Sequence, residues 1–532
     1  MPMPDDVMST RTAELVGVLR QSLGANAVKD DEATRALMSQ DIWAKGHLAD
    51  CVIVPESLEQ LAEAAQAAHA RGIILNPRGG GMSYTKAYAP DRPGVAVLDL
   101  SRMNRVLALN TEDMYVTVEA GCTWADLHAA VSAKGLRTPF WGPLSGLTST
   151  IGGGLSQNNA FFGAGKYGST GDSVLSVTVV LADGTIVRTG TGGTMGAKPF
   201  WRHYGPDLTG LFVGDGGILG FKAEITFRLI PAPAHEAWAS FEFETRHQCA
   251  EALAALIRED LATEIFGFDP NLTKVRMARA SMMSDAKALT NVMKKQGNVL
   301  KALTEGAKVA MAGRGFMDDA AYTLHYTVEG RSEFGVKEEI GILNKISKAH
   351  GGKTIENSIP KIIRANPFAP LNNILGPSGE RWVPIHGIVP VSEGAACWEE
   401  IDTAFEEMRD ELDQHDILTG ALITSLGTTG YLIEPVFIWP EEIFAIHEQT
   451  IEKQVLNKIT RFDPNPAATA IVERARQKVL DIFSARGAAH FQIGRTYPYK
   501  SGREAGALDL LERIKKALDP DGTVNSGALG LG

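Results

Sequence analysis

Amphipathic helices alternate with short apolar strands along the first part of this 532-residue chain. Residues 10–23 and 57–70 carry apolar side chains at helical spacing, and Ser57 with Gln60 three residues later forms a capping box. Apolar runs predict buried strands at 51–55, 73–77, 95–100 and 115–119. The order strand, helix, strand predicts a β-α-β unit, in which ligands bind at the carboxyl ends of the strands.

The pattern changes near Pro231 and Pro233, where we place a domain boundary. Before it we expect a helix at 124–133 and strands at 176–181, 186–188 and 223–230. Beyond it, long helical segments at 398–413 and 467–486 accompany strands at 239–244, 323–329, 383–391 and 432–438. A basic, Met-rich segment at 274–314 is either a membrane-surface or partner-binding hairpin or, as we favour, a solvated helical insert.

The composition is that of a soluble globular protein, with 44% hydrophobic and 22% charged residues. A net charge of -11 argues against general nucleic-acid binding, which needs surplus Lys and Arg. The four cysteines are scattered without metal-binding spacing, so we expect them to be reduced. No run approaches the roughly 20 apolar residues of a membrane span. Acidic residues stand where a signal peptide needs basic ones, so we expect a cytoplasmic protein without a membrane span.

Three glycine-rich stretches, each beside an expected strand, are the strongest indication of a ligand: 76–84, 141–172 and 211–220. Glycine lets the backbone approach a ligand closely and exposes its N–H groups, as a pyrophosphate requires. None of the stretches is a Walker A motif or a GxGxxG dinucleotide fingerprint. The second stretch also carries Trp141, Phe161, Phe162 and Tyr167, which suits a wall against a large flat ligand. The alternative is three structural turns.

The sequence Pro77-Arg78-Gly79-Gly80-Gly81-Met82-Ser83 resembles the pyrophosphate loop of the FAD-binding family that includes vanillyl-alcohol oxidase and 4-cresol dehydrogenase. Further segments are similar to this family in the same order, at 98–131, 171–190, 207–220, 382–394 and 511–530. The resemblance implies an α+β fold. Residues 1–235 and 476–532 would form a two-part FAD-binding domain, and residues 236–475 an antiparallel-sheet cap over the flavin. It also implies a homodimer.

The resemblance implies an FAD site built from all three glycine-rich stretches. Residues 78–83 would bind the pyrophosphate, 152–154 and 158–168 would follow the ribityl chain and ring, Asp172 would brace that loop, and 217–221 would lie near the pyrimidine. The implied cofactor-binding residues are Pro77, Arg78, Gly79, Gly80, Gly81, Met82, Ser83, Tyr84, Pro143, Gly152, Gly153, Gly154, Asn158, Asn159, Gly163, Gly165, Tyr167, Gly168, Asp172, Gly217, Ile218, Gly220, Phe221 and Asn525.

Departures from the family pattern limit what the resemblance implies. Met82 stands where many members have a flavin-linking His, and the other linking position falls near Trp382, offset from His386, so we expect non-covalent FAD. The Tyr-Arg pair that holds a phenolate aligns with Phe491 and Gln492, and an aspartate near the flavin aligns with Ser149 or Thr150. The 4-hydroxybenzyl chemistry is therefore not implied, and Phe491, Gln492 and Trp382 are expected in the substrate pocket.

Candidate catalytic residues are those that the cap and the last segment should bring toward the flavin: His386, His490, Tyr431, Glu434 and Arg495. One of them would take the proton of a substrate hydroxyl while the flavin takes the hydride. In an extended strand Tyr431 and Ile433 share one face and Glu434 the other. Each candidate also has an ordinary interpretation, as a hydrogen-bonded His, a core Tyr or a paired Glu. The paired-His metal motifs of D-2-hydroxy-acid dehydrogenases are missing, so we expect no metal.

We therefore expect an FAD-dependent oxidase or dehydrogenase that oxidises an alcohol or benzylic carbon of a medium-sized, aromatic, phenylpropanoid or lignin-type molecule. O2 or another acceptor would reoxidise the flavin. The first alternative is a D-2-hydroxy-acid dehydrogenase of the D-lactate or glycolate type. An alternative of another class is a non-catalytic flavin-binding redox partner.

Overall fold

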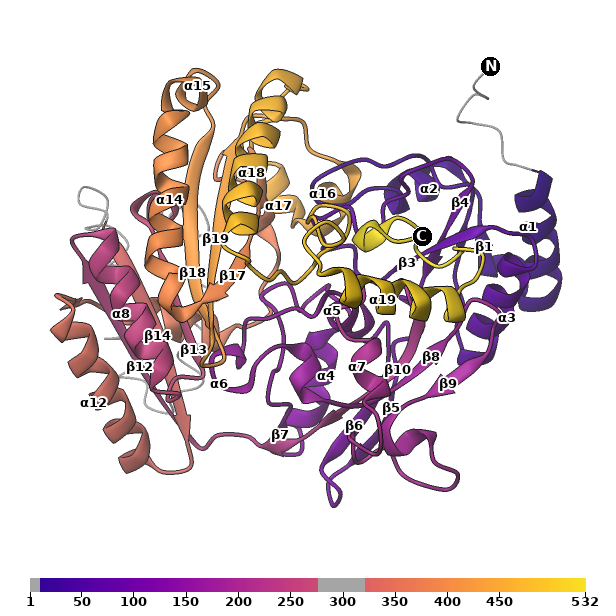
Figure 1. Ribbon diagram of the computed structural model, residues 1–532, viewed down its shortest axis with the longest axis horizontal. Helices are drawn as coiled ribbons and strands as arrows, with labels where there is room; N and C mark the ends of the chain where they lie inside the picture. Colours follow the sequence, from indigo (N-terminus) through magenta and orange to yellow (C-terminus); the bar gives the residue numbers. More distant parts are fainter. Residues whose placement is uncertain (1–9, 276–320) are drawn as a thin grey trace.

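Two sheets form the first half of the protein in this computed structural model, which describes residues 10–275 and 321–532 (Figure 1). The first sheet has the order β1 (Val28–Lys29), β2 (Val52–Ile53), β4 (Val95–Asp99), β3 (Ile74–Arg78). Its last three strands are parallel, and helix α3 (Leu58–His69) connects β2 to β3. The Ser57 hydroxyl accepts a hydrogen bond from the backbone N–H of Gln60, so the expected cap is present.

The second sheet is antiparallel, with the order β5 (Val106–Asn110), β6 (Tyr115–Glu119), β10 (Phe221–Arg228), β8 (Val174–Val180), β9 (Ile186–Arg188). The central strands β8 and β10 are almost wholly buried, because helices pack against them. Helix α4 (Trp124–Ser132) packs into the same core through Trp124 and Leu127.

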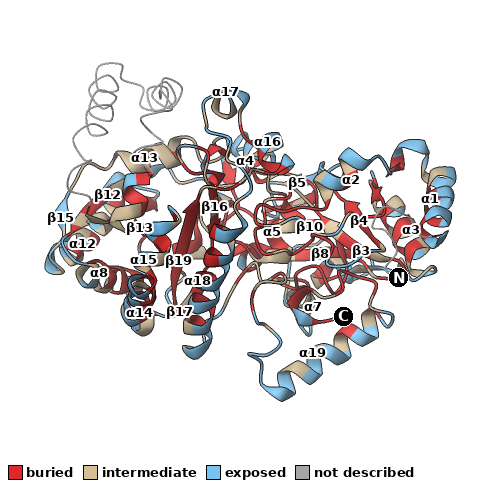
Figure 2. Ribbon diagram, turned by 90° about the horizontal axis from the view of Figure 1, so that it is seen from above, coloured by how far each residue is buried: buried red, intermediate tan, exposed pale blue. Residues whose placement is uncertain are grey.

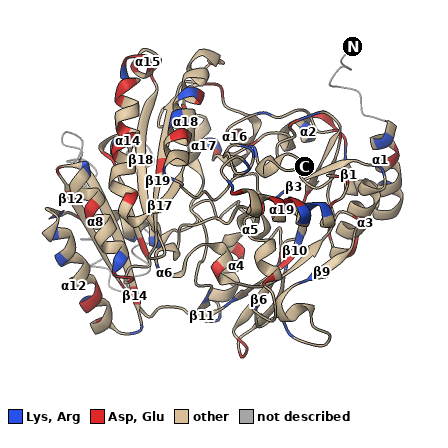
Figure 3. Ribbon diagram, in the orientation of Figure 1, with Lys and Arg blue, Asp and Glu red and all other residues tan. Residues whose placement is uncertain are grey.

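The second half is an eight-stranded antiparallel sheet with the order β15 (Lys353–Thr354), β12 (His235–Phe243), β14 (Tyr322–Gly330), β13 (Glu264–Phe268), β18 (Leu418–Leu426), β19 (Gly430–Trp439), β16 (Arg381–Pro384); β17 (Gly387–Pro390) also pairs with β19. Helices α8 (Arg246–Arg258), α12 (Glu333–Ala349), α14 (Gly394–Glu407) and α18 (Pro466–Ala485) cover one face. Charged residues of both signs occur along α12 and α18, as expected of helices with one solvated face (Figure 3).

The C-terminal part of the chain returns to the first half. Helix α19 (Ala505–Leu518) lies beside it, and Val524 then bridges Leu75 of β3 in parallel. Most of α19 is exposed, whereas central strands such as β8 and β10 are buried (Figure 2). The remaining helices are α1 (Thr10–Leu23), α2 (Glu32–Met38), α5 (Ile151–Gln157), α6 (Ala164–Tyr167), α7 (Leu208–Leu211), α13 (Ser358–Ala365), α15 (Arg409–Gln414), α16 (Ala445–Thr450) and α17 (Lys453–Leu456); two short strands, β7 (Leu136–Arg137) and β11 (Ile230–Pro231), pair with each other.

The expected α+β fold with a large antiparallel cap sheet is confirmed, with two local corrections. The strand expected at 383–391 is broken between β16 and β17, opposite Pro435, which has no N–H to donate to the ladder. The helix expected at 398–413 is divided at Met408 into α14 and α15. Beyond its first two residues, the basic segment expected at 274–314 lies outside the described residues.

Candidate functional site: two adjoining cavities

The three glycine-rich stretches meet around one cavity, although they are far apart in the sequence. The exit of β3, the start of α5, the turn before β10 and the C-terminal segment each supply part of its wall. The lining residues include Pro77, Arg78, Gly79, Gly80, Gly81, Met82, Ser83, Pro143, Gly152, Gly153, Gly154, Asn159, Gly217, Gly220 and Asn525, all of which the sequence had assigned to the cofactor.

The first glycine stretch is held in place by side chains on either side of it. Arg78 donates from Nη1 to the carbonyl oxygens of Met38 at 3.0 Å and Gln40 at 2.8 Å, and the Tyr88 hydroxyl donates to the Gly81 carbonyl at 2.5 Å. A Cβ atom on Gly80 would lie 2.0 Å from the Thr148 carbonyl oxygen. The loop therefore fits against its neighbour only because it has no side chain there.

The glycines at 152–154 form the first turns of helix α5 rather than the loop that the sequence had suggested. The Thr150 hydroxyl caps this helix by accepting from the Gly153 N–H. A Cβ on Gly152 would approach the Cβ of Ala120 to 2.7 Å, so glycine allows α5 to lie close to β6. The close packing thus explains why glycine, a residue of low helix propensity, stands in this helix.

A second cavity adjoins the first and lies under the cap sheet. It encloses about 1050 Å³ of space, part of it open to solvent. Four residues line both cavities: Met82, Pro143, Ser145 and Gln492. Most of the other walls are apolar, and the polar exceptions include Tyr84, Asn373, Thr424, Ser425 and Glu434. The three residues assigned to the substrate, Trp382, Phe491 and Gln492, all line this cavity.

Tyr84, Gln492 and Glu434 are three of the polar residues that line the second cavity. The buried Tyr84 ring packs edge-on against Trp382 at 5.9 Å between centroids. Burial, and next the negative charge of Glu434, raise the pKa of the Tyr84 hydroxyl well above its ordinary value, while a hydrogen bond with Gln492 opposes the shift. The Gln492 backbone has a φ of 51° and donates to the Gln157 carbonyl at 2.7 Å, so its position is tied to the end of α5.

Neither His386 nor His490 is among the residues that line these two cavities. His386 is fully buried; its Nε2 donates to the Phe491 carbonyl at 2.7 Å, and its Nδ1 accepts from the Tyr497 hydroxyl at 2.9 Å. Burial lowers the pKa of His386 to about 3, so the ring is neutral in ordinary buffers. His490 donates to the His386 carbonyl at 2.8 Å. In this arrangement both rings support the last segment of the chain.

Two further catalytic candidates also lie away from the cavities. The Tyr431 ring is buried on the helix-covered face of the cap sheet, next to Gly394. Arg495 donates to the carbonyl oxygens of Lys86 at 2.8 Å, Ala87 at 2.9 Å and Ser526 at 2.7 Å, so it joins loops of the first half. Of the five catalytic candidates, only Glu434 is among the described residues that line these two cavities.

Part of the second glycine stretch contacts the cap sheet instead of lining the first cavity. The Gly165 N–H donates to the Thr263 carbonyl at 2.9 Å, and the Gly163 N–H donates to Glu264 Oε1 at 2.7 Å. Asp172 accepts from the Ser169 N–H at 2.8 Å, which braces this stretch as expected. The assigned cofactor residues outside the cavity lining are Asn158, Gly163, Gly165, Tyr167, Gly168, Asp172, Ile218 and Phe221; Tyr84 lines the second cavity.

Several lining residues of the cofactor cavity were not anticipated: Ala87, Tyr88, Leu100, Ala120, Ser145, Ser149, Thr150, Ser156, Gln157, Gly216 and Lys222. Lys222 lies just after the third glycine stretch and pairs with Asp215, both buried. The available signal was a basic residue directly before the expected buried strand at 223–230.

In residues 10–275 and 321–532, no group of three or more His, Cys, Asp or Glu side chains is arranged to hold a metal ion. Over the same part of the chain, no helix combines the length and the apolar character that a membrane crossing needs.

Comparisons with known proteins agree with this geometry. Residues 49–190 match the family described as FAD binding domain. Glycolate oxidase subunit GlcD of Bacillus subtilis (strain 168) is 30% identical over 282 residues, 52% of this chain and 58% of that protein. A mitochondrial D-lactate dehydrogenase [cytochrome] of Arabidopsis thaliana is 30% identical over 285 residues, 52% of this chain and 48% of that protein. The chain thus spans about half the length of these curated relatives.

Solved structures resemble the whole chain. A p-cresol methylhydroxylase with bound substrate has a TM-score of 0.73 at 17% identity, over 99% of this chain and 98% of that one. A 4-ethylphenol oxidase from Gulosibacter chungangensis has a TM-score of 0.68 at 17% identity, over 99% of both chains. At such identities the likeness concerns the fold. Residues 49–190 are therefore an FAD-binding domain, and the chain has the mixed α+β fold of p-cresol methylhydroxylase, with a large antiparallel cap sheet.

Proposed function

We propose that this protein is an FAD-dependent oxidoreductase that removes a hydride from the alcohol carbon of an apolar, medium-sized substrate. The observation that carries this proposal is the pair of adjoining cavities, which share Met82, Pro143, Ser145 and Gln492. The first cavity has the glycine walls that FAD requires, and a molecule in the second would lie against the cofactor. Bound FAD would supply the hydride acceptor.

The residues of the second cavity would bind and orient the substrate. Tyr84 and Gln492 would hydrogen-bond a hydroxyl group of the substrate, and the Glu434 carboxylate would take its proton as the hydride leaves. The apolar walls, including Phe161, would exclude water and pack against the rest of the molecule. No Lys, Arg or His is among the described residues that line this cavity, which favours an uncharged substrate. Phenylpropanoid alcohols belong to this class.

A D-2-hydroxy acid is the second candidate substrate, and the curated relatives favour it over an aromatic alcohol. Proteins named glycolate oxidase subunit and D-lactate dehydrogenase are about 30% identical over half of this chain. A carboxylate in the second cavity would, however, lie near Glu434 without a lining cation. The relatives and the cavity thus favour different substrates, and a direct comparison decides between them.

We propose that FAD is held without a covalent bond, because no His or Cys is among the described residues that line either cavity. Acid precipitation of the purified protein should therefore release the flavin into the supernatant, where its absorbance is measured. Flavin that stays with the pellet after washing would contradict the proposal.

The replacement Gly80→Ala should weaken FAD binding about 10- to 100-fold, because the new Cβ would clash with the rigid backbone at Thr148. The measurement is the FAD content of the purified variant and its dissociation constant for FAD. Gly341→Ala in helix α12 is the control, since no atom lies within 4 Å of its new Cβ. Normal FAD affinity in Gly80→Ala would place the cofactor elsewhere.

Uncharged aromatic and aliphatic alcohols should bleach the flavin under anaerobic conditions faster than D-lactate or glycolate does. The measurement is the rate of flavin reduction in a stopped-flow instrument, over a panel that contains both classes. Faster bleaching by the hydroxy acids would reject the first substrate class and select the second. A bound flavin that no alcohol bleaches would support a non-catalytic flavin-binding protein.

Glu434→Gln should slow flavin reduction about 100- to 10,000-fold, since the neutral amide cannot take the hydroxyl proton. FAD content should stay unchanged, because Glu434 lines only the second cavity. Glu442→Gln is a suitable control, because this exposed carboxylate pairs with Lys45 at 2.8 Å and is not among the residues that line either cavity. Equal reduction rates in Glu434→Gln and the parent protein would remove Glu434 as the base.

A further inference from the structure

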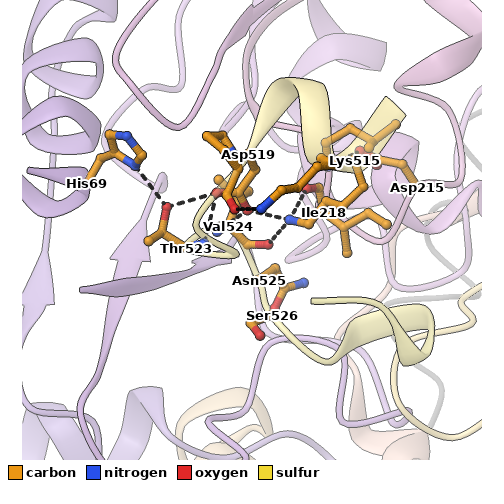
Figure 4. A network of polar contacts seen from close by, with 12 residues as sticks. His69, Asp215, Ile218, Lys515, Asp519, Thr523, Val524, Asn525 and Ser526 are labelled. Atoms are coloured by element: carbon orange, nitrogen blue, oxygen red, sulfur yellow. Dashed lines mark hydrogen bonds and ion pairs between the residues drawn. The ribbon is translucent and has the colours of Figure 1, made fainter. Parts of the chain in front are cut away.

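The C-terminal segment contributes Asn525 to the wall of the first cavity. Figure 4 shows the polar contacts around this segment. The Leu75 N–H of β3 donates to the Thr523 carbonyl at 2.8 Å, and the Asn525 N–H donates to the Leu75 carbonyl at 2.9 Å. The Asn525 side chain donates to the carbonyl oxygens of Ala87 at 3.0 Å and Gly216 at 2.6 Å. The segment thus joins the strand that carries the first glycine stretch to the turn that carries the third.

Lys515 is the one residue of helix α19 that is buried. Its Nζ donates to the Ile218 carbonyl at 2.8 Å, to the Val524 carbonyl at 3.0 Å and to Asp519 Oδ2 at 2.5 Å (Figure 4). These three acceptors use all the donors of an ammonium group. An amphipathic surface helix would ordinarily bury an apolar residue at this place, because a buried charge costs free energy unless it is fully paired.

Asp519 completes the arrangement from the other side. Its carboxylate accepts from the Thr523 N–H at 2.9 Å, the Thr523 hydroxyl at 3.0 Å and the Val524 N–H at 2.9 Å. The side chain is almost inaccessible to solvent, so these bonds replace its hydration. Lys515 and Asp519 therefore fix the C-terminal segment and the Ile218 carbonyl in one rigid unit.

The turn that this unit holds is intrinsically pliable. Gly216 and Gly217 have φ angles of 60° and 77°, in the left-handed region that glycine reaches at little cost, and glycine has many other conformations open to it. Asp215 restrains the turn internally by accepting from the Gly217 N–H at 3.0 Å. Lys515 restrains it from outside through Ile218. Without these restraints, FAD binding would have to order the turn. The free energy needed for this ordering would weaken the binding of FAD.

We propose that Lys515 and Asp519 are positioning residues that hold the turn at Gly216–Gly220 in the conformation that FAD binding requires. The inference rests on FAD as the occupant of the first cavity. It predicts that a change outside the cavity, in the C-terminal helix, weakens FAD binding without altering any residue that lines it.

Lys515→Met should raise the dissociation constant for FAD about 10-fold or more, which is the effect of losing a hydrogen-bonded buried charge. The full-length protein is stripped of flavin and titrated with FAD, and the quenching of flavin fluorescence is followed. Lys516→Met is the matched control; this neighbouring lysine is exposed and donates to the Pro520 carbonyl, so its FAD affinity should stay within about 2-fold. Equal affinities for Lys515→Met and the parent protein would overturn the proposal.

Asp519→Asn tests the same unit with a nearly isosteric change and serves if Lys515→Met does not fold. It should weaken FAD binding in the same direction, and an unchanged affinity in the folded variant overturns the proposal. Thermal unfolding of the flavin-free proteins separates a positioning role from a purely structural one. A lower midpoint of unfolding with unchanged FAD affinity means a purely structural role, and this result also overturns the proposal. A parent protein that binds no FAD would remove the proposed function itself, whereas equal affinities would remove only this inference.

Discussion

The close approach of backbone from distant parts of the chain is the constraint on which the site depends. Gly80 lies against Thr148, Gly152 lies against Ala120, and a Cβ atom at either glycine would overlap its neighbour. Three strands bring these segments to one place, the parallel strand β3 and the antiparallel strands β6 and β10. Each of these strands ends or begins at the first cavity. The fold therefore supplies N–H groups and space, and the glycines keep that space free of side chains.

A buried group of charges joins the two halves of the protein beside this site. Arg137 of β7 pairs with Glu329 of β14, and Arg364 of α13 pairs with Glu264 at 3.0 Å and also with Glu329. Glu264 in turn accepts from the Gly163 N–H of the second glycine stretch. Because buried charges tolerate few arrangements, this group fixes how the cap sheet sits over the FAD-binding half. The second cavity is a consequence of that fit.

The sequence was informative wherever a local pattern determines the structure. Helix α1 has the expected bounds, the strand at Tyr115–Glu119 has the expected bounds, and the glycine stretches pointed to one cofactor cavity. It was less informative for glycines that serve tertiary contacts: Gly163 and Gly165 bind the cap sheet, and Gly152 belongs to a helix. Glycine composition alone does not distinguish a ligand wall from close packing of two elements.

The continuity of a strand explains why Glu434 lines the second cavity and His386 lines neither cavity. Strand β19 is continuous, so alternation puts Tyr431 and Ile433 toward the helices and Leu432 and Glu434 toward the cavity. His386 lies in the break between β16 and β17, opposite Pro435, where alternation no longer applies. Its ring turns instead toward Tyr497 and the Phe491 carbonyl, which only the folded chain brings near. The alternation of side chains along a strand predicts which face a residue lies on, as far as the hydrogen-bond ladder of the strand continues. Beyond the ladder, tertiary contacts determine where the side chain points.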